Sequence, residues 1–453
     1  MTAETTPHTD AAILDRLTGL IDQATSAGAD AADAILVDST SLSMARRLGQ
    51  PESVERSEST DLGLRVFVGK RQAIVSSSDL TSGALDALVD RAVAMARSVP
   101  EDPHCGLATP DLLATAFPDL EQFDPGEPSP EALADLAQRA EDAARAVVGV
   151  TNSEGAEAGW ARDRVAVAAS NGFAHLRAAT RHSLSVSVLA GEGTGMERDY
   201  DYDARVFAAD LRPAEQIGRA AGEKAVRRLN PRKVGSAQVP VVFDPRVSRS
   251  LLGHLAGAVN GAAIARGTSF LKDRLEKPVF PAGVTIIDDP LRPRGLRSKS
   301  FDAEGVATAR RQVIDDGVLT TWLLDLRSAR QLGLHTTGNA SRGVASPPSP
   351  STTNFYLAAG QVAPRDLMAD ITGGLYVTEL IGFGVNSVTG DYSRGATGFW
   401  IDGGEIAYPV SEITIAGNLV DMFAHLTAAD DLEFRYGTDA PTVRIDGMTV
   451  AGQ

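Results

Sequence analysis

The stretch Phe243–Leu271, which reads FDPRVSRSLLGHLAGAVNGAAIARGTSFL, predicts the element around which the C-terminal half is organised. An apolar strand, Val239–Phe243, leads into Asp244 and Pro245, which favour the N-cap and the first position of a helix. Apolar residues then recur at helical spacing, at Leu251, Leu252, Leu255, Val259 and Ala263. The pattern predicts one continuous helix that begins at Pro245 and ends before Gly267.

The other face of this predicted helix is made of small residues, namely Gly253, Ala256, Gly257, Asn260 and Gly261. Each glycine inside a helix costs roughly 0.5–1 kcal/mol relative to alanine. A run of them therefore indicates close packing against another backbone.

Two blocks of the sequence carry a resemblance to a known family. The order of strand, Asp-Pro, glycine-rich helix, ARGTSFL (265–271) and VTIIDDP (284–290) resembles the C-terminal domain of the TldD/PmbA family. The block 61–108, which begins DLGLRVFVGKRQAIV, resembles the first sequence block of the same proteins.

The resemblance also indicates a branch of the family. In the catalytic TldD branch the organising helix carries HExxxH, whose histidines bind the metal, and a cysteine near the C-terminus completes the site. Here the motif positions fall on Leu252, Gly253 and Gly257, and residues 434–442 contain no cysteine. The chain therefore resembles the PmbA/TldE branch, which implies no catalytic and no metal-binding residues of its own.

The candidate binding residues come from a second resemblance and from the organising helix. Residues 337–354 resemble the TGN…SR…TN block that lies near the substrate groove in the family, which nominates Asn339, Arg342, Thr353 and Asn354. His254 is the fifth candidate, at a groove or an interface. Turns that merely shape the sheet are an equal alternative for the block, and a helix position beside an interface is the alternative for His254.

Composition limits the classes of partner. Asp and Glu number 59 against 43 Lys and Arg, a formal charge of −16, which disfavours nucleic acid as a partner. The single cysteine, Cys105, excludes an internal disulfide and fits a reducing compartment. No signal-peptide pattern and no apolar run long enough for a membrane span is present. We expect a cytoplasmic protein without a membrane partner.

The predicted fold class is α+β. A flexible tail (1–9) precedes an N-terminal mixed α/β domain with antiparallel sheet and helices (10–230), whose sub-blocks 10–100 and 129–230 are joined by a proline-rich linker. A β-rich C-terminal domain follows (236–453). Finer expectations are a short strand at Ala34–Val37, a basic loop at Arg292–Lys299, and a terminal strand pair turning at Asp446-Gly447.

By resemblance, the expected function is that of a non-catalytic TldE-type subunit. It would pair with a TldD-type catalytic subunit, which holds the metal, expected to be zinc, and cleaves unfolded or leader peptides. One alternative is a peptide- or protein-binding modulator that acts without proteolysis. Another is a homodimeric peptidase whose relocated metal site uses His104, Cys105 or His254. A homodimer is also possible when the partner is missing.

Overall fold

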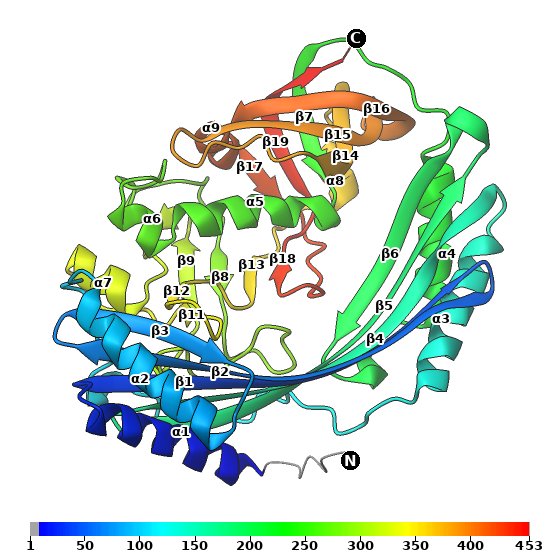
Figure 1. Cartoon of the computed structure of the whole chain (residues 1–453). Helices are drawn as coiled ribbons and strands as arrows, with labels where there is room; N and C mark the ends of the chain where they lie inside the picture. The colour runs from blue at the N-terminus through cyan, green and yellow to red at the C-terminus, as the bar shows by residue number, and fades with distance from the viewer. Residues whose placement is uncertain (1–8, 453) are drawn as a thin grey trace.

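The computed structural model describes residues 9–452, and its N-terminal half is built on one large curved sheet (Figure 1). The six strands are antiparallel in the order β3-β2-β1-β4-β5-β6. Their bounds are β1 Ala31–Arg47, β2 Gln50–Val68, β3 Arg71–Ser77, β4 Val150–Ala169, β5 Ala174–Ala190 and β6 Glu197–Arg205. Because β1 pairs with β4 from Asp33↔Ala169 to Arg46↔Ala156, the two predicted sub-blocks share this sheet.

Four helices cover one face of the sheet. These are α1 Asp10–Ser26, α2 Ser82–Ser98, α3 Pro130–Arg145 and α4 Ala214–Arg227. The first two pack over one end of the sheet and the last two over the other. The even-numbered residues of β1 and β4 face these helices, whereas Ile35 and Val167 face the C-terminal domain, where they pack with Phe301. This is the alternation that a strand imposes on successive side chains.

Local capping signals place the helix starts. Thr9 accepts a hydrogen bond from the Ala12 N–H, and Ser129 accepts one from the Ala132 N–H, with Pro130 at the first helical position. Apart from Thr9, the predicted flexible tail lies outside the described residues.

The C-terminal half contains a barrel and a smaller sheet. The barrel order is β16-β15-β14-β7-β19-β17, and an additional pairing of β16 with β19 closes it. Its strands are β7 Ala237–Phe243, β14 Gly373–Ile381, β15 Asp391–Asp402, β16 Glu405–Asn418, β17 Leu426–Ala428 and β19 Val443–Ala451. The smaller sheet, in the order β10-β9-β8-β13-β18, comprises β8 Ile286–Asp288, β9 Arg311–Asp315, β10 Val318–Leu319, β13 Phe355–Leu357 and β18 Thr438–Asp439. These features confirm the α+β class with a β-rich C-terminal region.

The remaining elements of this half are short. They are α5 Pro245–Ala258, α6 Gly261–Ala265, α7 Leu326–Leu332, α8 Pro364–Met368 and α9 Leu419–Ala424, with the two-stranded pair β11 Ala340–Ser341 and β12 Ser349–Pro350. None of the helices within residues 9–452 is long and apolar enough to cross a membrane.

One sequence expectation about strands was too short, and a second was wrong. The strand expected at Ala34–Val37 is the buried start of the 17-residue β1, whose polar remainder stays paired with β2. The expected terminal strand pair is the single strand β19, which contains a bulge between Ile445 and Met448. Gly447 takes a positive φ of 78° within this bulge, so the chain kinks and continues instead of reversing.

Candidate functional site: the α5–α6 groove

Helix α5 follows directly from β7, as the sequence predicted. The Asp244 side chain accepts a hydrogen bond from the Arg246 N–H, and Pro245 occupies the first position. Its apolar face, including Leu251, Leu252 and Leu255, is buried in the largest core of the chain. This burial fixes which side of the helix is left exposed.

The predicted continuous helix is interrupted at Val259. The Val259 carbonyl accepts a hydrogen bond from the Leu323 N–H, and the Gly261 N–H donates to the Leu323 carbonyl. The Asn260 side chain then caps a new helix, α6, by accepting from the Ala262 and Ala263 N–H groups. A tertiary contact with Leu323 therefore replaces the intrahelical ladder, which helical periodicity alone does not reveal.

The small residues of α5 and α6 have two different environments. A Cβ added at Gly261 would lie 2.8 Å from the Leu323 carbonyl oxygen and 2.4 Å from Leu324 Cδ2, so close packing is confirmed there. At Gly253 and Gly257 an added Cβ would meet no atom within 4 Å. No backbone within the described residues packs against these two exposed glycines, so for them close packing stays a prediction.

Gly253 and Gly257 open into a cavity of about 530 Å³, which we call the α5–α6 groove. The loop after β14 forms one side, where the Phe270 N–H donates to the Ser387 carbonyl. The groove is lined by Gly253, His254, Gly257, Asn260, Ala262, Ala263, Arg266, Thr268, Phe270, Ser349, Val385, Ser387 and Leu419.

His254 is the titratable group that α5 presents to this groove. Its ring lies edge-on to Tyr392, with 5.9 Å between centroids. Burial, and then the charge of Arg394, lower the pKa of His254, so the imidazole is neutral near pH 7. Its Nε2 and the Tyr392 hydroxyl are both buried and have no hydrogen-bond partner among the described residues. His254 therefore lines the groove as an uncharged ring whose Nε2 is buried.

The groove does not fit a metal ion. A protein zinc site needs three or more nitrogen, oxygen or sulfur ligands held together. Leu252, Gly253 and Gly257 supply none, and within residues 9–452 no group of three or more His, Cys, Asp or Glu residues could hold a metal. His104 and Cys105 line a different, much smaller cavity, where burial, and then Asp102, raise the pKa of the Cys105 thiol.

The structure places the other four candidates away from this groove's lining and buries their side chains. The Asn339 amide donates to Asp288, which also accepts from the Thr353 hydroxyl and N–H. Asn354 donates to the Ser298 hydroxyl and accepts from the Arg297 N–H. Asn339 and Thr353 thus meet at one buried carboxyl, and Asn354 anchors the adjacent basic loop. A role for the four in peptide binding stays a prediction.

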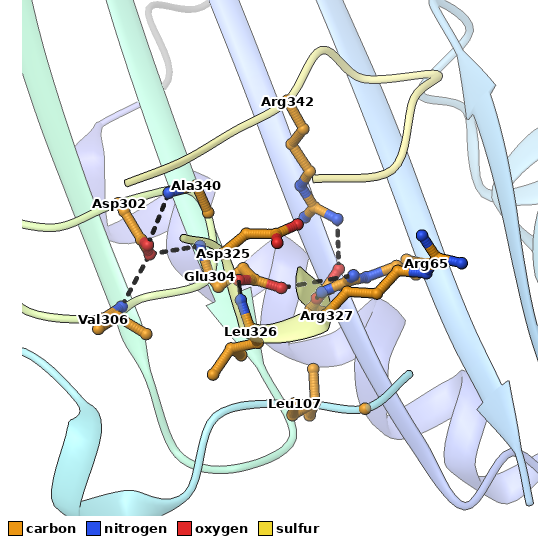
Figure 2. Close-up of polar contacts among 12 residues, drawn as sticks. Arg65, Leu107, Asp302, Glu304, Val306, Asp325, Leu326, Arg327, Ala340 and Arg342 are labelled. Carbon is orange, nitrogen blue, oxygen red and sulfur yellow. Dashed lines mark hydrogen bonds and ion pairs between the residues drawn. The ribbon is translucent and has the colours of Figure 1, made fainter. Parts of the chain in front are cut away.

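Arg342 joins the two halves of the molecule. Figure 2 shows Arg65, Glu304 and Arg342 converging at this junction. Arg342 Nη1 lies 2.6 Å from Asp33 Oδ1, and Arg65 Nε lies 3.0 Å from Asp33 Oδ2. Burial raises the pKa of Asp33, but Arg342 and Arg65 outweigh it and lower the pKa overall. The sequence signal was available, because an arginine inside the apolar strand LGLRVFV (62–68) requires a buried partner.

Glu304 completes this junction cluster. Its carboxylate accepts a hydrogen bond from the Leu326 N–H at 2.9 Å and lies 3.9 Å from Arg65. Burial raises its pKa to about 8; Arg65 opposes the shift and Asp302 adds to it. Asp302 accepts hydrogen bonds from the N–H groups of Glu304, Val306 and Ala340, which Figure 2 also shows in part. The cluster is a structural junction and lies apart from the groove.

Comparisons with known proteins match most of the chain to one family. Sequence profiles of the PmbA/TldA metallopeptidase match domain 1 at residues 32–96, the central domain at 123–229 and the C-terminal domain at 236–452. The metalloprotease PmbA of Escherichia coli O157:H7 is 40% identical over 426 residues, covering 94% of this chain and 93% of that protein. The crystal structure of a proposed modulator of DNA gyrase from Bacteroides thetaiotaomicron superposes with a TM-score of 0.90 at 27% identity, covering 98% of this chain and 100% of the other.

Relatives from one bacterium separate the two branches. The PmbA homologue of Haemophilus influenzae is 37% identical over 434 residues, covering 95% of this chain and 94% of that protein. The TldD homologue of the same species is 28% identical over 296 residues, covering 59% and 61%. Profiles, relatives and fold agree, and the chain belongs to the PmbA/TldD metallopeptidase family.

Proposed function

We propose that this chain is the non-catalytic, TldE-type subunit of a heteromeric cytoplasmic peptidase. Its partner is a TldD-type subunit, which holds the metal, zinc by expectation, and cleaves unfolded or leader peptides. The observation that carries the proposal is on α5. By resemblance, Leu252, Gly253 and Gly257 occupy the positions of the family's HExxxH motif. The two glycines line the α5–α6 groove and leave open space there. The chain's greater similarity to a PmbA homologue than to a TldD homologue supports the same branch.

The exposed glycines suggest what the groove does in such an assembly. A helix with no side chain at Gly253 and Gly257 lets another backbone approach closely. Within the chain no atom fills that space. We assign the approaching backbone to the partner subunit or to the peptide that the two subunits enclose.

The test is reconstitution from separate subunits. This protein, a TldD-type subunit carrying HExxxH, and their co-expressed mixture are assayed for association and for cleavage of an unstructured peptide. We expect cleavage by the mixture, its loss when the first histidine of the partner's motif is replaced by alanine, and its retention in the His254→Ala variant of this chain. Cleavage by this chain alone, lost in His254→Ala, would overturn the proposal and favour a relocated site.

The same experiment distinguishes the modulator alternative. A protein that binds peptides without proteolysis needs no TldD-type partner. If this chain binds peptides but forms no complex with any TldD-type subunit from the same cell, the subunit proposal fails and the modulator reading replaces it.

A further inference from the structure

Two arginines of β5 point toward the C-terminal domain. The even-numbered residues Leu184, Val186 and Val188 of β5 pack against α3 and α4, so the odd-numbered residues face the opposite way. Arg177 and Arg181 are among these odd-numbered residues. Phe173, on the same side, packs against Phe301 of the C-terminal domain.

The C-terminal domain presents three cations to the same region. Arg297 and Lys299 lie on the loop after β8, and Arg249 lies near the start of α5. Partial burial lowers the pKa of Arg297; Asp439 and Asp288 oppose this shift, and Arg249 and Arg181 add to it. Burial likewise lowers the pKa of Lys299; Asp302 and Asp288 oppose this shift, and Arg177 adds to it. Arg177 and Lys299 line one cavity, whereas Arg297 lies beside Gly437 and Arg249 lies over the neighbouring Tyr436 ring. We call the five side chains Arg177, Arg181, Arg249, Arg297 and Lys299 the basic strip.

Carboxylates lie near three members of the basic strip without pairing with them: Asp302 acts on Lys299, Asp439 on Arg297 and Asp163 on Arg177. None of its five members forms an ion pair with a carboxylate in the part of the chain that the structure describes. The polar contacts of Arg297 and Lys299 are with neutral groups, the Thr438 hydroxyl at 3.2 Å and the Ala340 carbonyl at 3.2 Å. Asp288, Asp302 and Asp439 instead accept hydrogen bonds from other groups.

One end of the basic strip lines a cavity, and the other end contacts an aromatic ring. Arg177 and Lys299 line a cavity of about 730 Å³, whose other charged lining residues are Arg162, Arg164, Asp10, Asp119 and Glu121. Asp10 pairs with Arg164, and Glu121 pairs with Arg294. The Phe117 and His175 rings stack in the same cavity, with 3.7 Å between centroids. At the other end, the Arg249 guanidinium lies over the Tyr436 ring, 4.3 Å from its centroid. Since Asp10 and Glu121 are paired, Arg162, Arg177 and Lys299 outnumber Asp119 beside this open space, which favours an anionic ligand.

We propose that the basic strip binds an acidic segment of an extended peptide. Arg177 and Arg181 are four residues apart on one strand, which places them about 13 Å apart. Carboxylates four residues apart on an extended peptide have the same spacing. Arg181 and Arg297 are exposed, so their guanidinium groups are accessible to such carboxylates. This inference rests on the proposed function, because it names the class of peptide that the assembly receives.

The overall charge favours a peptide over a nucleic acid. A formal charge of −16 repels a dense polyanion at long range. A peptide with two or three carboxylates experiences much less of that repulsion, and within a Debye length of about 8–10 Å the strip attracts it. The strip therefore selects a sparsely charged acidic chain.

The experiment measures peptide binding to this protein alone. An unstructured, fluorescent peptide with two Asp–Glu pairs four residues apart is compared, by anisotropy at low and high salt, with the same peptide carrying Asn and Gln. The test variant is Arg181→Gln with Arg297→Gln. The matched control is Lys70→Gln with Arg91→Gln, which removes the same charge from exposed positions elsewhere.

We expect the acidic peptide to bind more tightly than its neutral twin. The test variant should weaken the acidic peptide roughly three- to thirtyfold, the range for two exposed charge pairs, and reduce its salt dependence. The control variant and the neutral peptide should be unchanged. Equal binding of the two peptides, or equal binding by the test and control variants, would overturn the inference, and so would tighter binding of a single-stranded oligonucleotide.

Failure of the inference is separable from failure of the proposed function. If the reconstituted mixture cleaves acidic and neutral peptides at equal rates, with or without the substitutions at Arg181 and Arg297, that result overturns the acidic-peptide inference and leaves the subunit proposal intact. If this chain binds the acidic peptide selectively but forms no complex with a TldD-type subunit, the subunit proposal fails and the acidic-peptide inference stands.

Discussion

At the scale of single residues, the most unusual group is the buried carboxyl of Glu304. Burial raises its pKa from 4.5 to about 8, although Arg65 opposes the shift. The folded protein therefore holds a proton that the unfolded chain releases above about pH 4.5. Since the native state binds more protons in this window, the free energy of unfolding falls as pH rises from about 4.5 to about 8.

The Glu304→Gln variant tests this titration. Gln keeps the acceptor for the Leu326 N–H but cannot ionise. Between pH 5 and 8 the wild-type free energy of unfolding should fall more steeply than that of the variant, by at most about 1.4 kcal/mol per pH unit. Urea unfolding at several pH values measures both slopes. Glu405→Gln, at an exposed pair with Arg365, is the control and should keep the wild-type slope.

At the scale of elements, the interruption between α5 and α6 separates two kinds of glycine. Gly253 has open space around it, whereas Gly261 lies against the Leu323 backbone. Gly253→Ala should raise the free energy of unfolding by about 0.5–1 kcal/mol, since it removes the helix cost of glycine without a clash. Gly261→Ala should lower it by about 1–3 kcal/mol through overpacking. Chemical denaturation compares the two variants, and similar effects of the same sign would contradict the structure.

The loop between β14 and β15 carries the most exposed apolar side chains near the groove. Phe383 is 96% exposed, and Ile381 and Val388 are 57% and 52% exposed. We expect this loop to contact the TldD-type subunit in the proposed assembly. Phe383→Ser should therefore weaken association at least tenfold, as loss of an aromatic contact at an interface does, while leaving thermal stability unchanged. Val148→Ser, at another highly exposed apolar residue, is the matched control. Equal affinity of the Phe383 and Val148 variants would remove this loop from the interface.

The helix starts and the fold class could be predicted from the sequence because their signals are local. Asp244 and Ser129 cap the helices that follow them, as expected. The break in the helix at Val259 could not be predicted from the sequence, because it depends on contacts with Leu323, which is distant along the chain. The same holds for the basic strip: Arg292–Lys299 was visible as a basic loop, but only the fold brings Arg177 and Arg249 beside it.

At the scale of the whole molecule, the buried ion pair between Arg342 and Asp33 connects the C-terminal half to the N-terminal sheet. A direct backbone contact lies beside it, since a Cβ at Gly63 would lie 2.0 Å from the Val344 carbonyl oxygen. The resemblance nominated Arg342 as a binding residue, a role that stays a prediction. Its partner could not be inferred from the sequence, because 309 positions separate it from Asp33.

Arg342→Met tests how strongly this pair couples the halves. Methionine keeps much of the volume but leaves Asp33 with Arg65 alone, so unfolding should become easier by about 3 kcal/mol, the lower end for breaking a buried pair. Arg365→Met, at a surface pair, should change stability by less than about 0.5 kcal/mol. Urea denaturation followed by tryptophan fluorescence gives both values. An Arg342 variant as stable as the Arg365 variant would show that the junction depends on its apolar contacts instead.

The central claim concerns where the metal resides. The most direct measurement is the metal content, by elemental mass spectrometry, of the purified complex between this chain and a TldD-type subunit. The account predicts one metal ion per heterodimer, lost when the partner's HExxxH histidines are replaced and unchanged in His254→Ala of this chain. One equivalent of metal bound to this chain alone, or its loss from the complex in His254→Ala, would contradict the account.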